Sequence, residues 1–77
     1  MNRVKDLVLG SDGAAFDTKT GRTYRVNSTG QMVLRLLQDG RPEAEIVREL
    51  AARHAQHVAV VAAATEAFLG QLRRYLP

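Results

Sequence analysis

The sequence predicts one small α+β domain of 77 residues, with an N-terminal three-stranded antiparallel sheet followed by three helices. Two observations predict this fold. Before Asn27, short extended segments alternate with turn residues, and after Asn27 apolar residues recur at helical spacing in three successive segments. A chain of this length buries only about 60% of its unfolded surface, which leaves no room for a deep substrate cavity beside the core.

The predicted strands cover residues 4–9, 14–17 and 22–27. A glycine at the end of the short loop between the last two strands suits a type I turn that closes with a left-handed residue. In that register Phe16 lies opposite Tyr24, and Val26 shares the face because side chains alternate along a strand.

The predicted helices cover residues 29–39, 42–55 and 58–76. The first begins in a run of N-cap residues at Asn27 and ends before Gly40. Leu34 falls off its apolar stripe, so we expect it either to be half exposed or to meet another element. The core-facing residues predicted for the second and third helices are Ile46, Val47, Leu50, Ala51, His54, Val58, Val61, Ala62, Thr65, Phe68, Leu69, Leu72 and Leu76.

Composition excludes several classes of protein. The chain has no cysteine, which excludes a disulfide framework, a thiolate zinc site and a cysteine nucleophile. The N-terminal apolar run is too short for a secretory signal, and no segment approaches the roughly 20 apolar residues of a membrane span. We therefore expect a cytoplasmic protein that does not act at a membrane.

No catalytic constellation is visible in the sequence. Ser11 and Ser28 stand in turn or cap positions, where a hydroxyl usually satisfies the backbone. His54 and His57 have no further metal ligands beside them, so we expect a half-buried His54 and a solvated His57. The acids of the second helix are explained by the helix dipole. The sequence thus predicts a protein that is not an enzyme and has no metal or cofactor.

Three strands and three helices are also the content of a winged-helix module, so a regulatory or DNA-associated binding module is the alternative. The formal net charge is +3, without a cluster of bases. The start of the predicted third helix, at residues 58–64, holds only Val and Ala, which offer nothing to a base edge. Both observations disfavour nucleic acid.

Residues 15–30 read AFDTKTGRTYRVNSTG. A Phe-Asp pair, a turn ending in glycine, an aromatic strand, and then Asn and Thr-Gly before a helix resemble the PqqD-like family, also called RiPP recognition elements. Later segments fit the family pattern as well: Leu36-Leu37 before Gly40, Glu45-Ile46-Val47 with Leu50, and Phe68-Leu69 with Leu72.

The resemblance implies a winged-helix-like, non-catalytic peptide chaperone of natural product biosynthesis. Such a domain binds the leader of a ribosomally made precursor peptide and presents it to a modifying enzyme, often a radical SAM protein. The leader adds as a strand beside the third strand, over the third helix. The peptide-binding residues expected here are Arg22, Thr23, Tyr24, Arg25, Val26, Leu69, Leu72 and Arg73. The sequence leaves open which flank of the third helix faces the peptide.

The reverse side of the third helix is small and apolar rather than charged. It carries Val60, Ala63, Ala67 and Gly70. Since glycine inside a helix costs about 1 kcal/mol relative to alanine, we expect a close contact there, with a partner enzyme or with a second copy in a homodimer.

Overall fold

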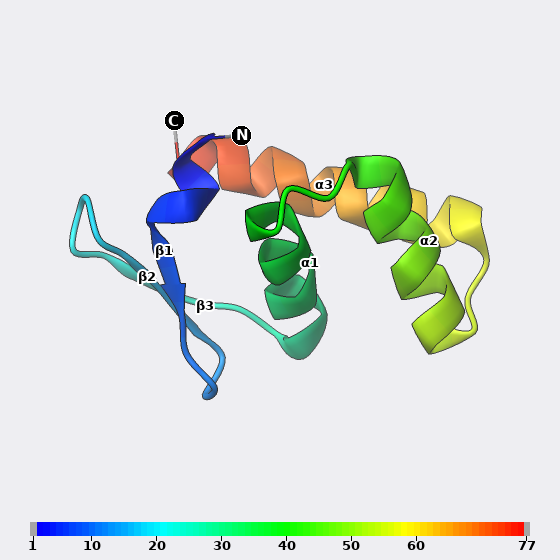
Figure 1. Cartoon of the computed structure of the whole chain (residues 1–77), viewed down its shortest axis with the longest axis horizontal. Coiled ribbons are helices and arrows are strands. Elements are labelled where there is room, and N and C mark those ends of the chain that lie inside the picture. The colour runs from blue at the N-terminus through cyan, green and yellow to red at the C-terminus, as the bar shows by residue number, and fades with distance from the viewer. Residues whose placement is uncertain (1, 77) are drawn as a thin grey trace.

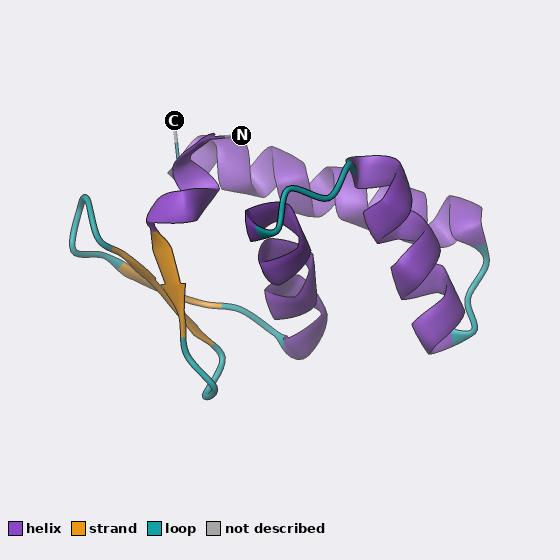
Figure 2. Cartoon of the chain, viewed as in Figure 1, coloured by secondary structure: helices purple, strands orange, loops and turns teal. Residues whose placement is uncertain are grey.

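The computed structural model describes residues 2–76. A short 3-10 helix, η1 (Asn2–Asp6), leads into strands β1 (Leu7–Leu9), β2 (Ala14–Asp17) and β3 (Thr23–Arg25). Helices α1 (Ser28–Gln38), α2 (Glu43–His54) and α3 (Val58–Tyr75) follow (Figures 1 and 2). The predicted α+β fold, a three-stranded antiparallel sheet followed by three helices, is confirmed.

Helix α3 is the longest element, and it organises the rest of the domain. It runs along the long dimension of the molecule, with α1 and α2 crossing it on one side (Figure 1). The sheet and η1 lie at its C-terminal end, where Leu76 packs in one cluster with Val4 and Leu7. The two ends of the described chain therefore meet at the same end of the molecule.

The predicted strand over residues 4–9 is wrong in its first half, where the chain forms η1 instead. Val4 and Leu7 are both buried, at 2% and 5% exposure. In a 3-10 helix, residues three apart lie on the same side, whereas in a strand they point to opposite faces. The Nε2 amide of Gln38 donates to the carbonyls of both residues, at 3.0 and 2.8 Å, so α1 secures this turn.

The register predicted for the β2–β3 hairpin is shifted by one residue. Ala15 pairs with Tyr24, and Phe16 pairs with Thr23. Next to the loop, the Asp17 N–H donates to the Arg22 carbonyl at 2.8 Å, which fixes every later pair. Because Asp17 faces the interior, alternation turns Phe16 outward, where it is 42% exposed. Tyr24 faces the core side opposite Ala15.

The helices end within a residue of their predicted bounds. Asn27 caps α1 as predicted, its Oδ1 accepting the Gly30 N–H at 2.7 Å. His54 is exposed, which corrects its predicted place in the buried stripe of α2. Val58, predicted in the stripe of α3, is 50% exposed. Both residues lie beside the turn between α2 and α3, at the end of the molecule away from the sheet (Figure 1).

The core consists of two clusters that share α3. One cluster joins the three helices, and its buried members are Val33, Leu36, Ile46, Val47, Leu50, Ala51, Val61 and Leu69. The other joins η1, the sheet and α1, and its buried members are Val4, Leu7, Ala15, Leu34 and Leu76. Leu34 is fully buried in this second cluster, so it lies off the α1 stripe because it meets the sheet. Phe68 and Leu72 pack against both clusters.

Among the residues described, no helix combines the length and the apolar character needed to cross a membrane.

Candidate functional site

Strand β3 forms one edge of the sheet, because the strand order is β1-β2-β3. The Asp17 N–H bonds to the Arg22 carbonyl, and the Val26 N–H bonds to the Gly13 carbonyl. In an antiparallel ladder, pairs with and without hydrogen bonds alternate. The N–H and C=O groups of Thr23 and Arg25 therefore point away from β2. Within residues 2–76, no hydrogen bond from another element reaches these groups.

The opposite edge of the sheet is less open. There the outward carbonyl of Leu7 accepts the Gln38 amide at 2.8 Å, and the carbonyl of Gly10 accepts the Gln31 amide at 2.7 Å. Both side chains come from α1 and lie along β1. Exposed strand edges that are left unguarded can pair with another chain, so β3 is the edge of this sheet at which such pairing is unobstructed.

A groove runs between β3 and the C-terminal half of α3, and we call it the strand groove. Its volume is about 370 Å³. The wall on the sheet side is Tyr24, Arg25, Val26 and Asn27. The opposite wall is Phe68, Gln71, Leu72 and Tyr75 of α3 with its C-cap Leu76, and the floor is Leu7, Ala15 and Leu34. Arg25 is the one charged side chain among these described residues, so the groove suits apolar side chains with a cationic margin.

The two ends of the strand groove differ. At the end nearer the C-terminus of α3, the rings of Tyr24 and Tyr75 meet at 5.5 Å between centroids, tilted by 50°. At the other end, Gly30 lies against Val26 and Phe68. A Cβ at Gly30 would lie 2.5 Å from Val26 Cγ1 and 3.1 Å from Phe68 Cε1. A glycine at this point is therefore required for α1 to begin so close to β3.

A second cavity of about 370 Å³ opens among the three helices, and we call it the helix pocket. Its floor is formed by buried residues, Gly30, Val33, Leu50, Val61 and Thr65. Its rim is formed by Asn27, Thr29, His54, Gln56, Ala64, Ala67, Phe68 and Gln71. Asn27, Phe68 and Gln71 also line the strand groove, so the two cavities adjoin.

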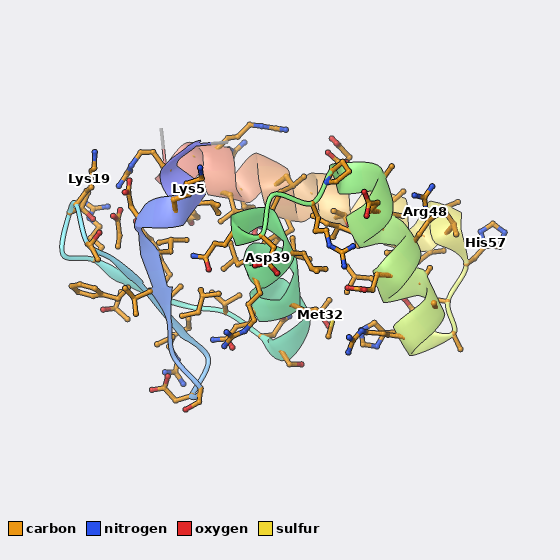
Figure 3. All side chains as sticks on the ribbon, viewed as in Figure 1. Lys5, Lys19, Met32, Asp39, Arg48 and His57 are labelled. Carbon is orange, nitrogen blue, oxygen red and sulfur yellow. The ribbon has the colours of Figure 1, made fainter. Side chains whose placement is uncertain are left out.

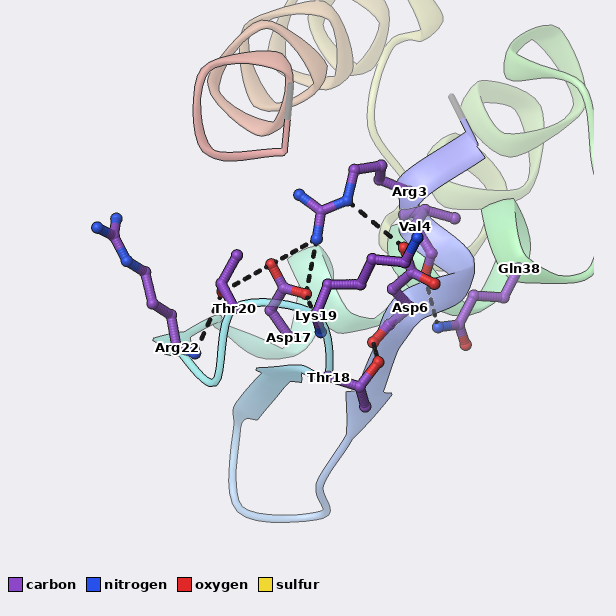
Figure 4. Close-up of polar contacts among 9 residues, drawn as sticks. All are labelled: Arg3, Val4, Asp6, Asp17, Thr18, Lys19, Thr20, Arg22 and Gln38. Carbon is purple, nitrogen blue, oxygen red and sulfur yellow. Dashed lines mark hydrogen bonds and ion pairs between the residues drawn. The ribbon is translucent and has the colours of Figure 1, made fainter.

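Asp17 holds the β2–β3 hairpin against η1 (Figure 4). Its buried carboxylate accepts from Arg3 at 2.8 Å, from the Lys19 N–H at 3.0 Å and from the Thr20 hydroxyl at 3.0 Å. Burial by itself raises the pKa of Asp17, but these hydrogen bonds outweigh it and hold the pKa below its ordinary value. The ionised carboxylate thus fixes the hairpin of which β3 is one strand.

The structure brings together only some of the residues that the sequence singles out for peptide binding. Tyr24, Arg25, Val26 and Leu72 line the strand groove, and Thr23 lies on its open edge. Arg22 is exposed beside the start of β3.

Two of the expected residues lie elsewhere. Leu69 is 4% exposed and packs in the cluster among the helices, on the far flank of α3. Arg73 does not line the groove. Its positive charge instead offsets part of the rise in the pKa of Glu43 in α2. The flank of α3 that faces the groove carries Phe68, Gln71, Leu72 and Tyr75. Phe68, expected only in the core, and Gln71 and Tyr75 were missed as groove residues, although the spacing of Phe68, Leu72 and Tyr75 is that of one helical face.

The small apolar stripe on the reverse of α3 is largely exposed. Val60 is 59% exposed, and Ala63 and Ala67 are exposed as well. Apart from the neighbouring backbone of α3 itself, nothing in residues 2–76 lies within 4 Å of a Cβ built on Gly70. Ala67 also lies on the rim of the helix pocket. A contact of this stripe with a partner enzyme or a second copy stays a prediction.

Acidic and histidine side chains do not gather into a metal-binding cluster in the described residues. In the described part of the chain, no three acidic or histidine side chains lie close enough to hold a metal ion. His57 points away from the fold at the start of α3 (Figure 3), and its Nδ1 accepts the Ala59 N–H at 3.2 Å. This histidine caps a helix.

The chain is thus a small α+β domain with an open sheet edge beside an apolar groove. The sequence model of the family described as Coenzyme PQQ synthesis protein D (PqqD) matches residues 13–75, well over half of the chain. The protein belongs to this family, and the family resemblance of the sequence is thereby confirmed. Searches of curated proteins and of solved structures gave no match.

Proposed function

We propose that this protein is a non-catalytic peptide chaperone. It binds the leader of a ribosomally synthesised precursor peptide in the strand groove and presents the peptide to a modifying enzyme, such as a radical SAM protein, in the cytoplasm. Membership of the PqqD family supports this proposal. The observation that carries it is the open edge of β3 beside an apolar groove.

Strand addition uses both features of the site. The outward N–H and C=O groups of Thr23 and Arg25 are available for main-chain hydrogen bonds, which supply affinity whatever the peptide sequence. Alternate side chains of an added strand face the same side as Tyr24 and enter the groove between β3 and α3. Apolar groups at these positions then supply selectivity.

Charge favours an acidic leader. Arg22 and Arg25 are exposed on the hairpin, and none of the described residues that line the strand groove is acidic. The net charge of the whole chain is +3. Opposite charge accelerates association more than it strengthens the complex, so we expect binding to weaken only modestly with salt unless the leader is strongly acidic.

A selection from a library of short random peptides tests this function. Peptides that the protein enriches in mRNA display are titrated into isotope-labelled protein, and amide shifts are followed by NMR. We expect the largest shifts at residues 22–27 and on the α3 flank that carries Gln71 and Leu72. Failure to enrich any peptide, or shifts confined to another surface, would overturn the proposal.

The DNA-associated alternative is tested in the same format. A duplex oligonucleotide replaces the peptide, and the salt dependence of the dissociation constant is measured. Binding through phosphates falls steeply with salt because counterions are released. Tight, steeply salt-dependent binding of the duplex, without peptide binding, would favour the alternative.

A further inference from the structure

We propose that the helix pocket is a second anchoring subsite for the same peptide, and that it takes an apolar side chain just beyond the strand-paired segment. This inference rests on the proposed function and extends it from one groove to two. It assigns a ligand to a cavity that strand addition alone leaves unused.

The two cavities adjoin along the path that a strand would follow, since Asn27, Phe68 and Gln71 line both. The strand groove follows β3 toward Asn27, where α1 begins, and the helix pocket opens at that point. Gln71 is exposed and lines both cavities from α3, opposite Asn27. A peptide that leaves the edge of β3 at Asn27 therefore passes directly over the mouth of the helix pocket.

The spacing of strand residues sets which side chain enters the helix pocket. Side chains of an added strand alternate, and each residue advances about 3.3 Å. The inward positions beside Tyr24 and Val26 fall in the strand groove. The next inward position lies past Asn27, at the helix pocket. The peptide should therefore carry apolar residues at three alternate positions, the third being the one held among the helices.

The chemistry of the pocket selects an apolar group. Its floor is made of buried residues from all three helices, among them Val33, Leu50 and Val61. Its described lining contains no Asp, Glu, Lys or Arg side chain. A cavity of about 370 Å³ is within the range of small ligand sites, and it accommodates a Leu or Phe side chain.

The test compares the same substitution at two exposed helical alanines. Ala64 of α3 lines the helix pocket, and Ala52 of α2 lines neither cavity, yet both are exposed. Ala64→Phe fills the pocket, and Ala52→Phe is the matched control. With a peptide enriched on the wild-type protein and labelled for fluorescence anisotropy, we expect Ala64→Phe to weaken binding about tenfold, because burial of one large apolar side chain is lost. Ala52→Phe should leave the dissociation constant unchanged.

A substitution in the peptide gives a second, independent test. Replacing its third inward apolar residue with alanine should weaken binding to the wild-type protein about tenfold and cause no further loss on Ala64→Phe, because the two changes remove one contact. If Ala64→Phe does not fold, the peptide replacement still decides. Suppose instead that a peptide shifts the amide signals of β3 and that neither change weakens its binding. This result overturns the second subsite and leaves the proposed function intact. If no library peptide reaches β3, both proposals fail together.

Discussion

One guanidinium nitrogen of Arg3 lies 2.8 Å from each carboxylate oxygen of Asp17, a side chain with no solvent exposure. This pair connects η1 to the end of β2, and through the following turn to β3. The turn is held to the same carboxylate by the Thr20 hydroxyl. The position of the open edge at β3 therefore depends on a charge pair at the other side of the sheet.

Asp17→Asn should make the protein less stable at neutral pH, because it removes the charge that Arg3 neutralises. The folded-state pKa of Asp17 lies below its ordinary value, so the unfolded chain takes up the proton first. The stabilisation is complete above the ordinary aspartate pKa of about 3.9 and is lost as the pH falls below it. Thermal unfolding followed by circular dichroism across this range measures the effect.

The difference between the wild-type protein and Asp17→Asn should thus shrink toward acid pH. Asp12→Asn is the control, since Asp12 is exposed in the turn between β1 and β2. Equal unfolding midpoints for wild type and Asp17→Asn at neutral pH would contradict the role of the pair.

Gly30→Ala should destabilise the protein by about 1–3 kcal/mol, the usual cost of an extra methyl group in a packed site. The new Cβ would lie 2.5 Å from Val26 and 3.1 Å from Phe68, and both residues line the strand groove. Urea denaturation measures the loss. Peptide binding at a temperature where the variant is folded should also weaken, because Phe68 must move.

Gly70→Ala should have the opposite effect on stability. This glycine lies inside α3, and apart from the neighbouring backbone of that helix nothing in the described chain comes within 4 Å of an added Cβ. The substitution should raise the free energy of unfolding by about 0.5–1 kcal/mol. A loss of stability would contradict the open space that the structure shows around Gly70.

Thr23→Pro should weaken peptide binding while keeping the fold. The Thr23 N–H points to the open edge, and proline is tolerated in an edge strand where its missing N–H would face solvent. Loss of one main-chain hydrogen bond should raise the dissociation constant several-fold, at roughly 0.5–1.5 kcal/mol per bond. Fluorescence anisotropy with a display-selected peptide measures the change.

Thr23→Val is the matched control, since valine keeps both the N–H and the branched shape. Its affinity should equal that of the wild-type protein. If the Thr23→Pro and Thr23→Val proteins bind the peptide equally well, the Thr23 N–H does not donate to the peptide. The proposed pairing along β3 would then have to be abandoned.

Glu66→Gln should stabilise the protein slightly at neutral pH. A hydrogen bond with Glu66 raises the pKa of Glu43, helped by burial and by the nearby Glu66 charge. The stabilisation that comes from protonated Glu43 is therefore present at acid pH and is lost as the pH rises through the raised pKa of Glu43. Glutamine removes the repulsion, so urea denaturation should show a gain near neutral pH and little change in acid. A gain of the same size at both pH values would contradict this origin.

Local signals in the chain were enough to predict the order and type of nearly all elements. Asn27 stands where a cap is needed, and its carboxamide does cap α1. Glycine at position 21 has φ +78°, which the predicted turn requires. Residues 4–6 were misassigned because Val4 and Leu7 are apolar in a pattern that suits either a short strand or a 3-10 turn. Only the contact with Gln38 of α1 decides between them.

The sequence by itself determined the fold class, since this follows from local caps, turns and apolar periodicity, and its resemblance to the PqqD-like family implied that a peptide adds beside the third strand. Tertiary structure alone decided the hairpin register and the flank of α3 that faces β3. Asp17 had to face Arg3, which turned Phe16 outward, and Leu69 had to fill the cluster among the helices, which left Phe68, Gln71 and Tyr75 to the groove. Both choices depend on residues far apart in the chain, and no local pattern records such contacts.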